Sequence, residues 1–247
     1  MGAILSGCSS NSVKKTDWKL FNLNGKVKSC KETSYYAFQE HGKATKGERG
    51  GKEPYSNTCT LFNDKGYRTE VFSYKHDGTL FVKYTYVRSN NALSEIIQAY
   101  ELESRTERLV FELNEKGLAS KINVYNEDGS IEYTQTYSYD DYNNTSEQHI
   151  NYPNSHMDKT ILYKYEDNRL IDFTFLSYDG ELAYKATYKY DDNNNVSEYC
   201  HYSADNTLKS KYIYTYDLDS NGNWITRYEY EDNVLRYITE REIEYFD

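Results

Sequence analysis

Large and small side chains alternate with a period of two along most of the chain. In residues 182–190 every second position is apolar or aromatic: Leu182, Tyr184, Ala186, Tyr188 and Tyr190. Such a period is expected of a β-strand with one covered face. The same alternation recurs at 80–86, 131–139 and 208–216. The pattern therefore predicts an all-β chain.

Polar turn sequences separate the alternating segments. Asp-Gly pairs stand at 77–78, 128–129 and 179–180, and related Asp-Asn pairs stand at 205–206 and 232–233. Asp-Gly favours a two-residue hairpin turn in which both residues have positive φ. The connections are too short for the crossover helices that parallel strands require. We therefore predict antiparallel strands joined in sequence order.

These segments form an internal repeat, marked by pairs of the form Tyr-x-Tyr and related apolar pairs. The second members are 24 to 27 residues apart, at Phe62, Tyr86, Leu113, Tyr139, Tyr165, Tyr190 and Tyr216. Each repeat of about 26 residues holds two strands. Counting a leading hairpin from Gly25 to Phe62, we predict an antiparallel β-meander of about 14 strands.

Three segments refine this reading. Residues 92–100 contain good helix formers, but Leu93-Ser94-Glu95 aligns with Val196-Ser197-Glu198 in the repeat, so a strand is predicted there. Residues 41–51 are rich in glycine and lysine and predict an exposed loop. The charged last strand, near 240–244, is expected to protect an open sheet edge from aggregation.

Composition changes the picture of the core. The chain has 29 tyrosines among 247 residues and a net charge of −10. This excludes a bundle of transmembrane helices, a coiled coil and a nucleic-acid binder of the basic-patch type. Tyrosine rings can bury a large apolar body while the hydroxyl stays hydrated. We therefore expect recurring tyrosine rungs, rather than a conventional aliphatic core, to hold the fold.

The first residues suggest a lipid anchor. Leu5-Ser6-Gly7-Cys8 looks like the cleavage site of a bacterial lipoprotein signal, which predicts lipidation of Cys8. On this reading residues 1–17 are a signal remnant and tether, and 18–247 are the repeat domain. Residues 1–6 also fit an N-myristoylation pattern, which stays as the weaker alternative. The absence of an acidic run after Cys8 favours the periplasmic face of the outer membrane.

The other cysteines, Cys30, Cys59 and Cys200, match no metal or redox spacing. A disulfide between Cys30 and Cys59 is conceivable across the first strands, but three cysteines cannot all pair. Buried or half-buried free thiols are the favoured prediction.

The best single repeat copy is Tyr214-Thr215-Tyr216-Asp217 followed by Asn221-Gly222-Asn223-Trp224. It resembles the YD repeats of Rhs-type bacterial proteins and the tyrosine-rich repeat lipoproteins of bacterial outer membranes. The resemblance covers roughly residues 61–247. It implies a twisted, largely single-layer open sheet. The shell function of large Rhs-type proteins does not transfer, because this chain has too few repeats to enclose a cargo.

The chain carries none of the GxSxG, GxxxxGK[ST] or GxGxxG motifs, and its five histidines lack a paired metal spacing. We therefore predict no enzymatic activity. Asp217, Asp219 and Asn221 reproduce the first half of a calcium loop, D-x-D-x-N-G, although the expected glutamate is absent. A polar hairpin turn is the favoured interpretation, and no other cofactor is predicted.

Two surfaces of the predicted sheet could bind a partner. One is a mostly acidic column at equivalent repeat positions, interrupted by Lys121 and Arg227: Glu70, Glu95, Glu147, Asp172 and Glu198. The other is a tyrosine ladder that could stack on sugars or contact proteins: Tyr165, Tyr188, Tyr190, Tyr214 and Tyr216.

We therefore predict a non-enzymatic, lipid-anchored β-repeat protein of the bacterial cell envelope that serves as a binding or scaffolding surface. The alternative is a carbohydrate-binding lipoprotein that uses the tyrosine ladder. Membrane lipid is the expected partner through Cys8, the protein or glycan partner is open, and nucleic acid is not expected.

Overall fold

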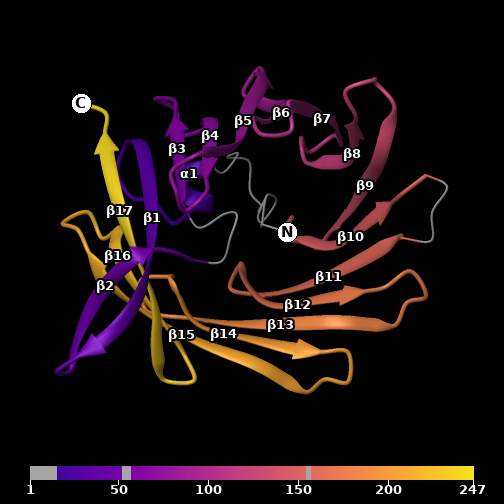
Figure 1. Cartoon of the computed structure of the whole chain (residues 1–247). Helices are drawn as coiled ribbons and strands as arrows, with labels where there is room; N and C mark the ends of the chain where they lie inside the picture. The colour runs from indigo at the N-terminus through magenta and orange to yellow at the C-terminus, as the bar shows by residue number, and fades with distance from the viewer. Residues whose placement is uncertain (1–15, 52–56, 154–156) are drawn as a thin grey trace.

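A computed structural model describes residues 16–51, 57–153 and 157–247 of the chain. The described residues form one short helix and seventeen strands (Figure 1). The elements are α1 (Asp17–Leu20), β1 (Val27–Glu40), β2 (Lys43–Arg49), β3 (Asn57–Phe62), β4 (Arg68–Tyr74), β5 (Leu80–Ser89), β6 (Ala92–Tyr100), β7 (Arg105–Leu113), β8 (Ala119–Tyr125), β9 (Ile131–Tyr139), β10 (Thr145–Asn151), β11 (Lys159–Glu166), β12 (Arg169–Leu176), β13 (Leu182–Tyr190), β14 (Val196–Ser203), β15 (Leu208–Leu218), β16 (Trp224–Glu231) and β17 (Val234–Tyr245).

The sheet closes into a barrel. Strands β3 to β17 pair antiparallel in sequence order, and β1 pairs with β3 on one side and with β17 on the other. These sixteen strands make a continuous ring, and β2 extends it by pairing with the second half of β1. The prediction of antiparallel strands in sequence order is confirmed. The predicted open, single-layer sheet of about 14 strands is wrong.

Twist explains why the sheet does not stay open. Strongly twisted sheets rarely exceed ~10 strands without curling, and closure removes both edges. The charges predicted to protect an edge instead pair across the β1–β17 seam. Lys31 lies 2.8 Å from Glu242, and Arg241 lies 2.8 Å from Glu32.

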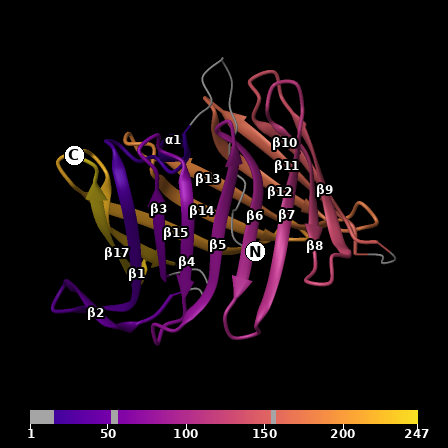
Figure 2. The same cartoon turned by 90° about the horizontal axis from the view of Figure 1, so that it is seen from above.

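The barrel is flattened into two walls. Strands β3–β8 form the upper wall in Figure 1, and β11–β15 form the lower wall. Figure 2 shows that the upper strands run across the lower ones at a steep angle. Such crossed walls diverge away from their corners, which leaves space between them. No helix in the described part of the chain is long and apolar enough to cross a membrane.

The Asp-Gly turns differ in detail from the prediction. Gly78 has a φ of +86°, whereas Asp77 does not have a positive φ. The Gly78 N–H donates to the Lys75 carbonyl over 3.0 Å, and the Lys75 N–H donates to the Thr79 carbonyl over 2.9 Å. This is a type I turn followed by a left-handed residue. The expected pair of positive φ values occurs at Asp232 and Asn233.

Two segments and the cysteines bear on further predictions. Residues 92–100 form strand β6, as predicted. Residues 43–49 are largely exposed, as predicted, but the predicted loop is wrong, because Lys43–Arg49 forms strand β2 against β1. Cys30, Cys59 and Cys200 are free thiols, as favoured. Cys30 is paired in register with Thr60 and Cys59 with Lys31, so these two cysteines lie on opposite faces of the wall.

Candidate binding site

The barrel wall has two chemically different faces. Residues directly opposite each other on neighbouring strands point to the same face. The register Glu32–Thr58–Ser73–Val82–Tyr100 follows one of these faces across five strands, and we call it the inner face. Its aromatic members include Tyr84, Tyr86, Tyr133, Tyr137, Tyr163, Phe173, Phe175, Tyr184, Tyr188, Tyr199, Tyr212 and Tyr214.

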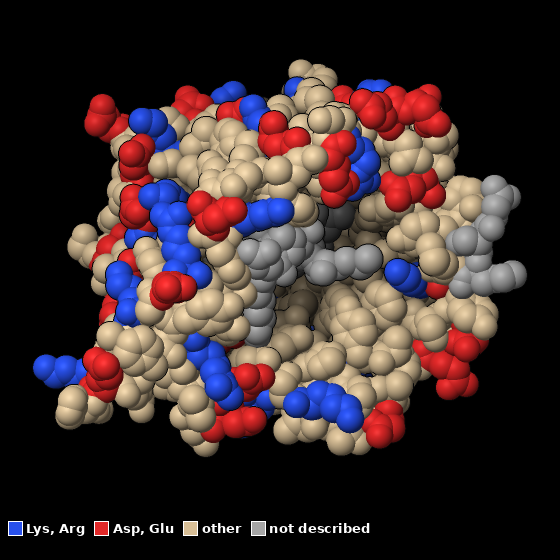
Figure 3. Space-filling view, in the orientation of Figure 1, with Lys and Arg blue, Asp and Glu red and all other residues tan. Residues whose placement is uncertain are grey.

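The outer face carries ion pairs. The predicted acidic column lies here, and each carboxylate has a basic partner: Glu70 with Lys83, Glu95 with Arg108, Glu147 with His149, Asp172 with Lys185, and Glu198 with both Lys189 and Lys211. Arg227 differs, because it is paired in register with Tyr216 and lies on the inner face. Figure 3 shows Lys, Arg, Asp and Glu distributed over the outside of the molecule and around a central hollow. The column is thus largely neutralised rather than a uniformly acidic surface.

A cavity of about 250 Å³ lies inside the barrel. Its walls come from β1, β3, β4, β5 and β17 and from the segment after α1: Phe21, Leu23, Cys30, Glu32, Thr58, Thr60, Phe62, Arg68, Val71, Ser73, Tyr84, Tyr86 and Arg241. Apolar and aromatic groups dominate this lining, with a few charged side chains among them. This is the usual composition of a small-molecule site.

Helix α1 and the residues after it cap this end of the barrel. The Trp18 indole N–H donates to the Val27 carbonyl over 2.8 Å. Asn22 donates through Nδ2 to Asn195 Oδ1 over 3.0 Å, in the turn between β13 and β14. Asn24 and Asn223 exchange two hydrogen bonds of 2.7 and 2.9 Å. The cap therefore reaches from β1 to turns almost two hundred residues away in the sequence.

A buried ionic cluster fixes the cap to the wall. Asp17 accepts a hydrogen bond of 2.7 Å from the Arg68 backbone N–H and one of 2.8 Å from Arg88 Nη2. The Arg68 guanidinium lies 4.6 Å from the ring centres of both Phe21 and Tyr86. It is thus held between an aromatic residue of the cap and one of β5, a favourable cation–π arrangement.

A second buried cluster lies at the β1–β17 seam. Arg241 donates from Nε to Glu32 over 2.9 Å, and its guanidinium stacks on Trp224 at 3.4 Å from the ring centre. Burial raises the pKa of Glu32, but Arg241 and Arg227 outweigh that effect, so its pKa lies below the usual range. Arg241 Nη1 is buried and has no hydrogen-bond partner among the described residues.

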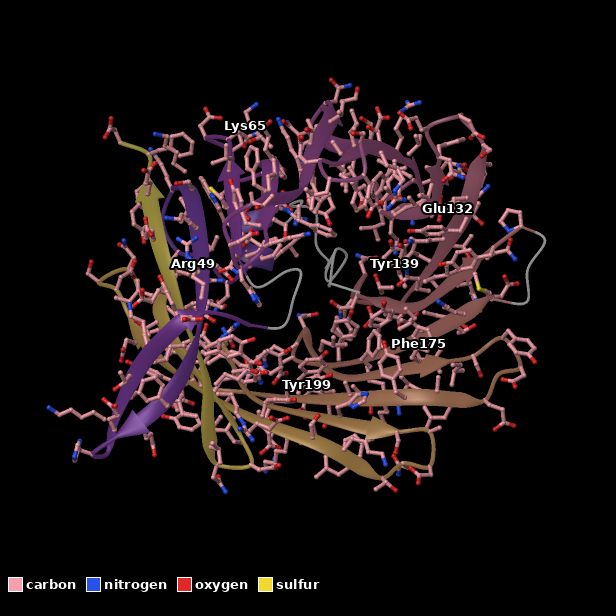
Figure 4. All side chains as sticks on the ribbon, viewed as in Figure 1. Arg49, Lys65, Glu132, Tyr139, Phe175 and Tyr199 are labelled. Atoms are coloured by element: carbon pink, nitrogen blue, oxygen red, sulfur yellow. The ribbon has the colours of Figure 1, made fainter. Side chains whose placement is uncertain are left out.

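Tyrosine hydroxyls donate hydrogen bonds to backbone carbonyls at the irregular end of three repeats. Tyr139, Tyr190 and Tyr216 donate to the carbonyls of Ala119, Leu170 and Val196 over 2.7, 2.9 and 2.6 Å. Each acceptor lies twenty residues earlier, beside a register shift in the ladder. Burial raises the pKa of Tyr216 to about 12, although Arg227 opposes the effect. Figure 4 shows Tyr139 beside the central space and Lys65 at the outer edge.

The five tyrosines predicted to bind a partner are half-buried positions on β11, β13 and β15. The alternation of these strands turns them toward the barrel interior: Tyr165, Tyr188, Tyr190, Tyr214 and Tyr216. They line the lower wall rather than an exposed sheet surface. Glycan binding by these residues stays a prediction, and in this geometry a sugar would have to enter the barrel.

The calcium-loop residues lie near the turn between β15 and β16. Asp219 accepts hydrogen bonds from the backbone N–H groups of Asn221 and Asn223, over 2.9 and 2.8 Å, and from the Tyr245 hydroxyl. Asp217 instead accepts from the Tyr228 hydroxyl over 2.9 Å. Among the described residues there is no group of three or more His, Cys, Asp or Glu side chains that could hold a metal ion. Calcium at Asp217, Asp219 and Asn221 stays a prediction. Cys8, the predicted lipidation site, lies outside the described residues.

Sequence reasoning missed the two arginine clusters. A signal was present at Arg241, which occupies a position of the alternation Tyr237, Thr239, Arg241, Ile243 where a large apolar residue is expected. A charged residue at such a position indicates a buried charge. Its partner Glu32 could not be found, because the pairing depends on closure of the barrel.

The barrel is similar to solved structures. It matches a porin-like protein from Bacteroides uniformis with a TM-score of 0.58 and 12% identity, covering 90% of this chain and 98% of that chain. A porin-like protein from Bacteroides vulgatus matches with a TM-score of 0.32 and 10% identity, covering 90% of this chain and 99% of that chain. A domain from Vibrio parahaemolyticus, described as an outer membrane lipoprotein-sorting protein domain, matches with a TM-score of 0.33 and 7% identity. This match covers 92% of this chain and 90% of that chain.

The first of these similarities shows a shared fold. No family model matches the chain, and no curated protein matches it. The comparisons therefore give the YD-repeat resemblance no family support, and they place the fold beside a porin-like barrel instead.

Proposed function

We propose that this chain is a non-enzymatic binding protein of the bacterial cell envelope, and that it binds an apolar or amphipathic small molecule inside its barrel. The observation that carries the proposal is the cavity of about 250 Å³ on the aromatic inner face. The binding surface predicted from sequence is thereby moved from the outside of a sheet to the inside of a barrel.

The distribution of charge supports this proposal. A barrel wall that faces lipid carries an outward apolar band and commonly encloses a polar interior. The outer face of this barrel instead carries ion pairs such as Lys185–Asp172 at 2.8 Å and Lys211–Glu198 at 2.7 Å, while many aromatic rings lie on the inner face. The outer face thus suits contact with water, and the inner face suits an apolar guest.

The proposed location rests on two further observations. The fold is similar to that of a porin-like protein from Bacteroides uniformis. The residues around Cys8 look like a lipoprotein cleavage site. We propose that a lipid on Cys8 holds the barrel at the periplasmic face of the outer membrane.

Binding inside the cavity can be tested with a fluorescent apolar dye such as N-phenylnaphthylamine. Thr58 lines the cavity, whereas its neighbour Cys59 lies on the outer face of the same strand. The wild-type chain should bind the dye, and Thr58→Trp should reduce the affinity at least about tenfold by filling the cavity. Cys59→Trp is the matched control and should bind normally.

Circular dichroism and thermal unfolding of both variants separate loss of the cavity from loss of the fold. Failure of the wild-type chain to bind the dye would contradict the proposal. Equal binding by a folded Thr58→Trp variant would also contradict it.

A further inference from the structure

Two arginines line the barrel cavity, each with a nitrogen that lacks a hydrogen-bond partner. Arg241 and Arg68 are largely buried, with side chains 8% and 13% exposed. Arg241 Nη1 has no hydrogen-bond partner among the described residues, and Arg68 Nε lies 3.7 Å from Asp17 Oδ1, beyond hydrogen-bond distance. A buried donor without a partner is destabilising, so such groups point to a missing acceptor.

The charges around the cavity favour an anion. Four guanidinium groups, those of Arg68, Arg88, Arg227 and Arg241, are gathered in the two clusters. Asp17 pairs with Arg68 and Arg88, and Glu32 pairs with Arg241. Arg241 Nη1 remains without a hydrogen-bond partner among the described residues, in a place largely shielded from water, where a guanidinium attracts an anion strongly.

Apolar groups share the cavity lining with the arginines. Phe62, Val71 and Tyr84 line the same cavity, and Phe62 is only 5% exposed. A ligand that satisfies both sets of groups needs an apolar body and one negatively charged head. Guanidinium groups bind the oxygens of carboxylates and phosphates with matching geometry.

We propose that the cavity binds an amphipathic anion, with its carboxylate or phosphate monoester head on Arg241 and its apolar body against Phe62 and Tyr84. This inference rests on the proposed function and deepens it by naming the ligand class. Arg241 can donate from Nη1 to the head group while Nε stays bonded to Glu32 and the guanidinium stays stacked on Trp224.

The test compares decanoate and decyl phosphate with decanol, which has the same body and no charge. Isothermal titration of the full chain should give a dissociation constant for at least one of the two anions about tenfold lower than that for decanol, equivalent to one charge-assisted hydrogen bond. Because Trp224 stacks on Arg241, its fluorescence should also change when an anion binds.

A paired variant tests the role of Arg241 without leaving Glu32 as an isolated buried charge. In E32Q/R241Q the preference for the anions over decanol should disappear, while decanol binding persists. The matched control is E95Q/R108Q, which neutralises an ion pair on the outer face and should keep the preference. Thermal unfolding of both variants shows whether each is folded.

The outcomes distinguish this inference from the proposed function. Equal affinity for decanoate, decyl phosphate and decanol in the wild-type chain would overturn the anion site but leave binding inside the barrel intact. Retention of the preference in a folded E32Q/R241Q variant would overturn the assignment to Arg241. If neither the three compounds nor the apolar dye bind, both the anion site and the proposed binding function would be overturned.

Discussion

The two walls of the barrel differ in the side chains that cover their inner faces. The upper wall, β5–β8, buries an aliphatic cluster in which Val82, Ile122 and Val124 are completely inaccessible to solvent. The lower wall, β11–β15, presents half-buried aromatic side chains such as Tyr184, Tyr188 and Tyr199. The aliphatic cluster is sealed from solvent, whereas the tyrosines of the lower wall stay half exposed on the inner face. The comparison teaches that one wall is stabilised by complete burial of aliphatic groups and the other by rings that keep some contact with solvent.

Alkaline unfolding should break the tyrosine wall first and have the largest effect. Burial raises the pKa of Tyr216 to about 12, and it also raises those of Tyr163 and Tyr188. A raised folded-state pKa means that the neutral phenol is stabilised. This stability is fully present below pH 10, the ordinary tyrosine pKa, and is lost as the pH rises toward 12. Tyrosinate absorbance and circular dichroism should therefore change together between these pH values. Tyrosinate absorbance that rises fully near pH 10 in a barrel with unchanged circular dichroism would contradict this expectation.

Truncation in the aliphatic wall should have the next largest effect. Ile96 is 1% exposed within the cluster on the inner face. Ile96→Ala should lower the free energy of unfolding by about 2–5 kcal/mol, because the cavity it creates cannot collapse in a packed wall. Denaturant unfolding measures the change. The control is Ile97→Ala, whose half-buried side chain lies on the outer face of the same strand. A loss as large for Ile97→Ala would show that the upper wall is not packed from one side.

Removal of one tyrosine hydroxyl should have the smallest effect. Tyr190→Phe deletes the 2.9 Å hydrogen bond to the Leu170 carbonyl and keeps the ring. The free energy of unfolding should fall by about 1 kcal/mol, since the carbonyl loses its side-chain partner. Tyr142→Phe is a suitable control because Tyr142 is 65% exposed, and it should change stability by less than ~0.5 kcal/mol. Equal effects in the two variants would assign no structural role to the hydroxyl of Tyr190.

Local features of the fold could be predicted from the sequence, and its closure could not. Alternation of the kind seen at Leu182–Tyr190 is a property of a single strand, so strands and their order follow from it. Closure depends on the pairing of β1 with β17, for example Cys30 opposite Ile243. No sequence pattern in either strand identifies the other as its partner. The composition of the core was likewise not predicted correctly, because burial depends on contacts between distant strands. The aliphatic residues of β5–β8 were expected to be secondary, yet Ile96 and Ile122 are among the most buried side chains.

The candidate site shows the same division. The tyrosine ladder was predicted from periodicity, but its direction was not, because an open sheet has no inside. Asp17 and Arg68 are separated by about fifty positions and meet only because the cap folds over the barrel end. Arg227 was assigned to the acidic column, but Thr226 holds that position, because it lies opposite Asp217 just before the register shift as Glu198 lies opposite Lys189. Arg227, one residue later, therefore lies on the inner face.

The seam between β1 and β17 has a consequence for biogenesis. β1 is the first strand along the described chain, and β17, the partner that closes the ring with it, is the last. During translation or export the growing chain therefore carries an early strand with one unsatisfied side, next to a sheet whose advancing end is also exposed. Both ends remain capable of joining another molecule until the final residues arrive. A chain that ends before Val234 would keep them permanently open, so premature termination should yield self-associating material instead of a smaller barrel.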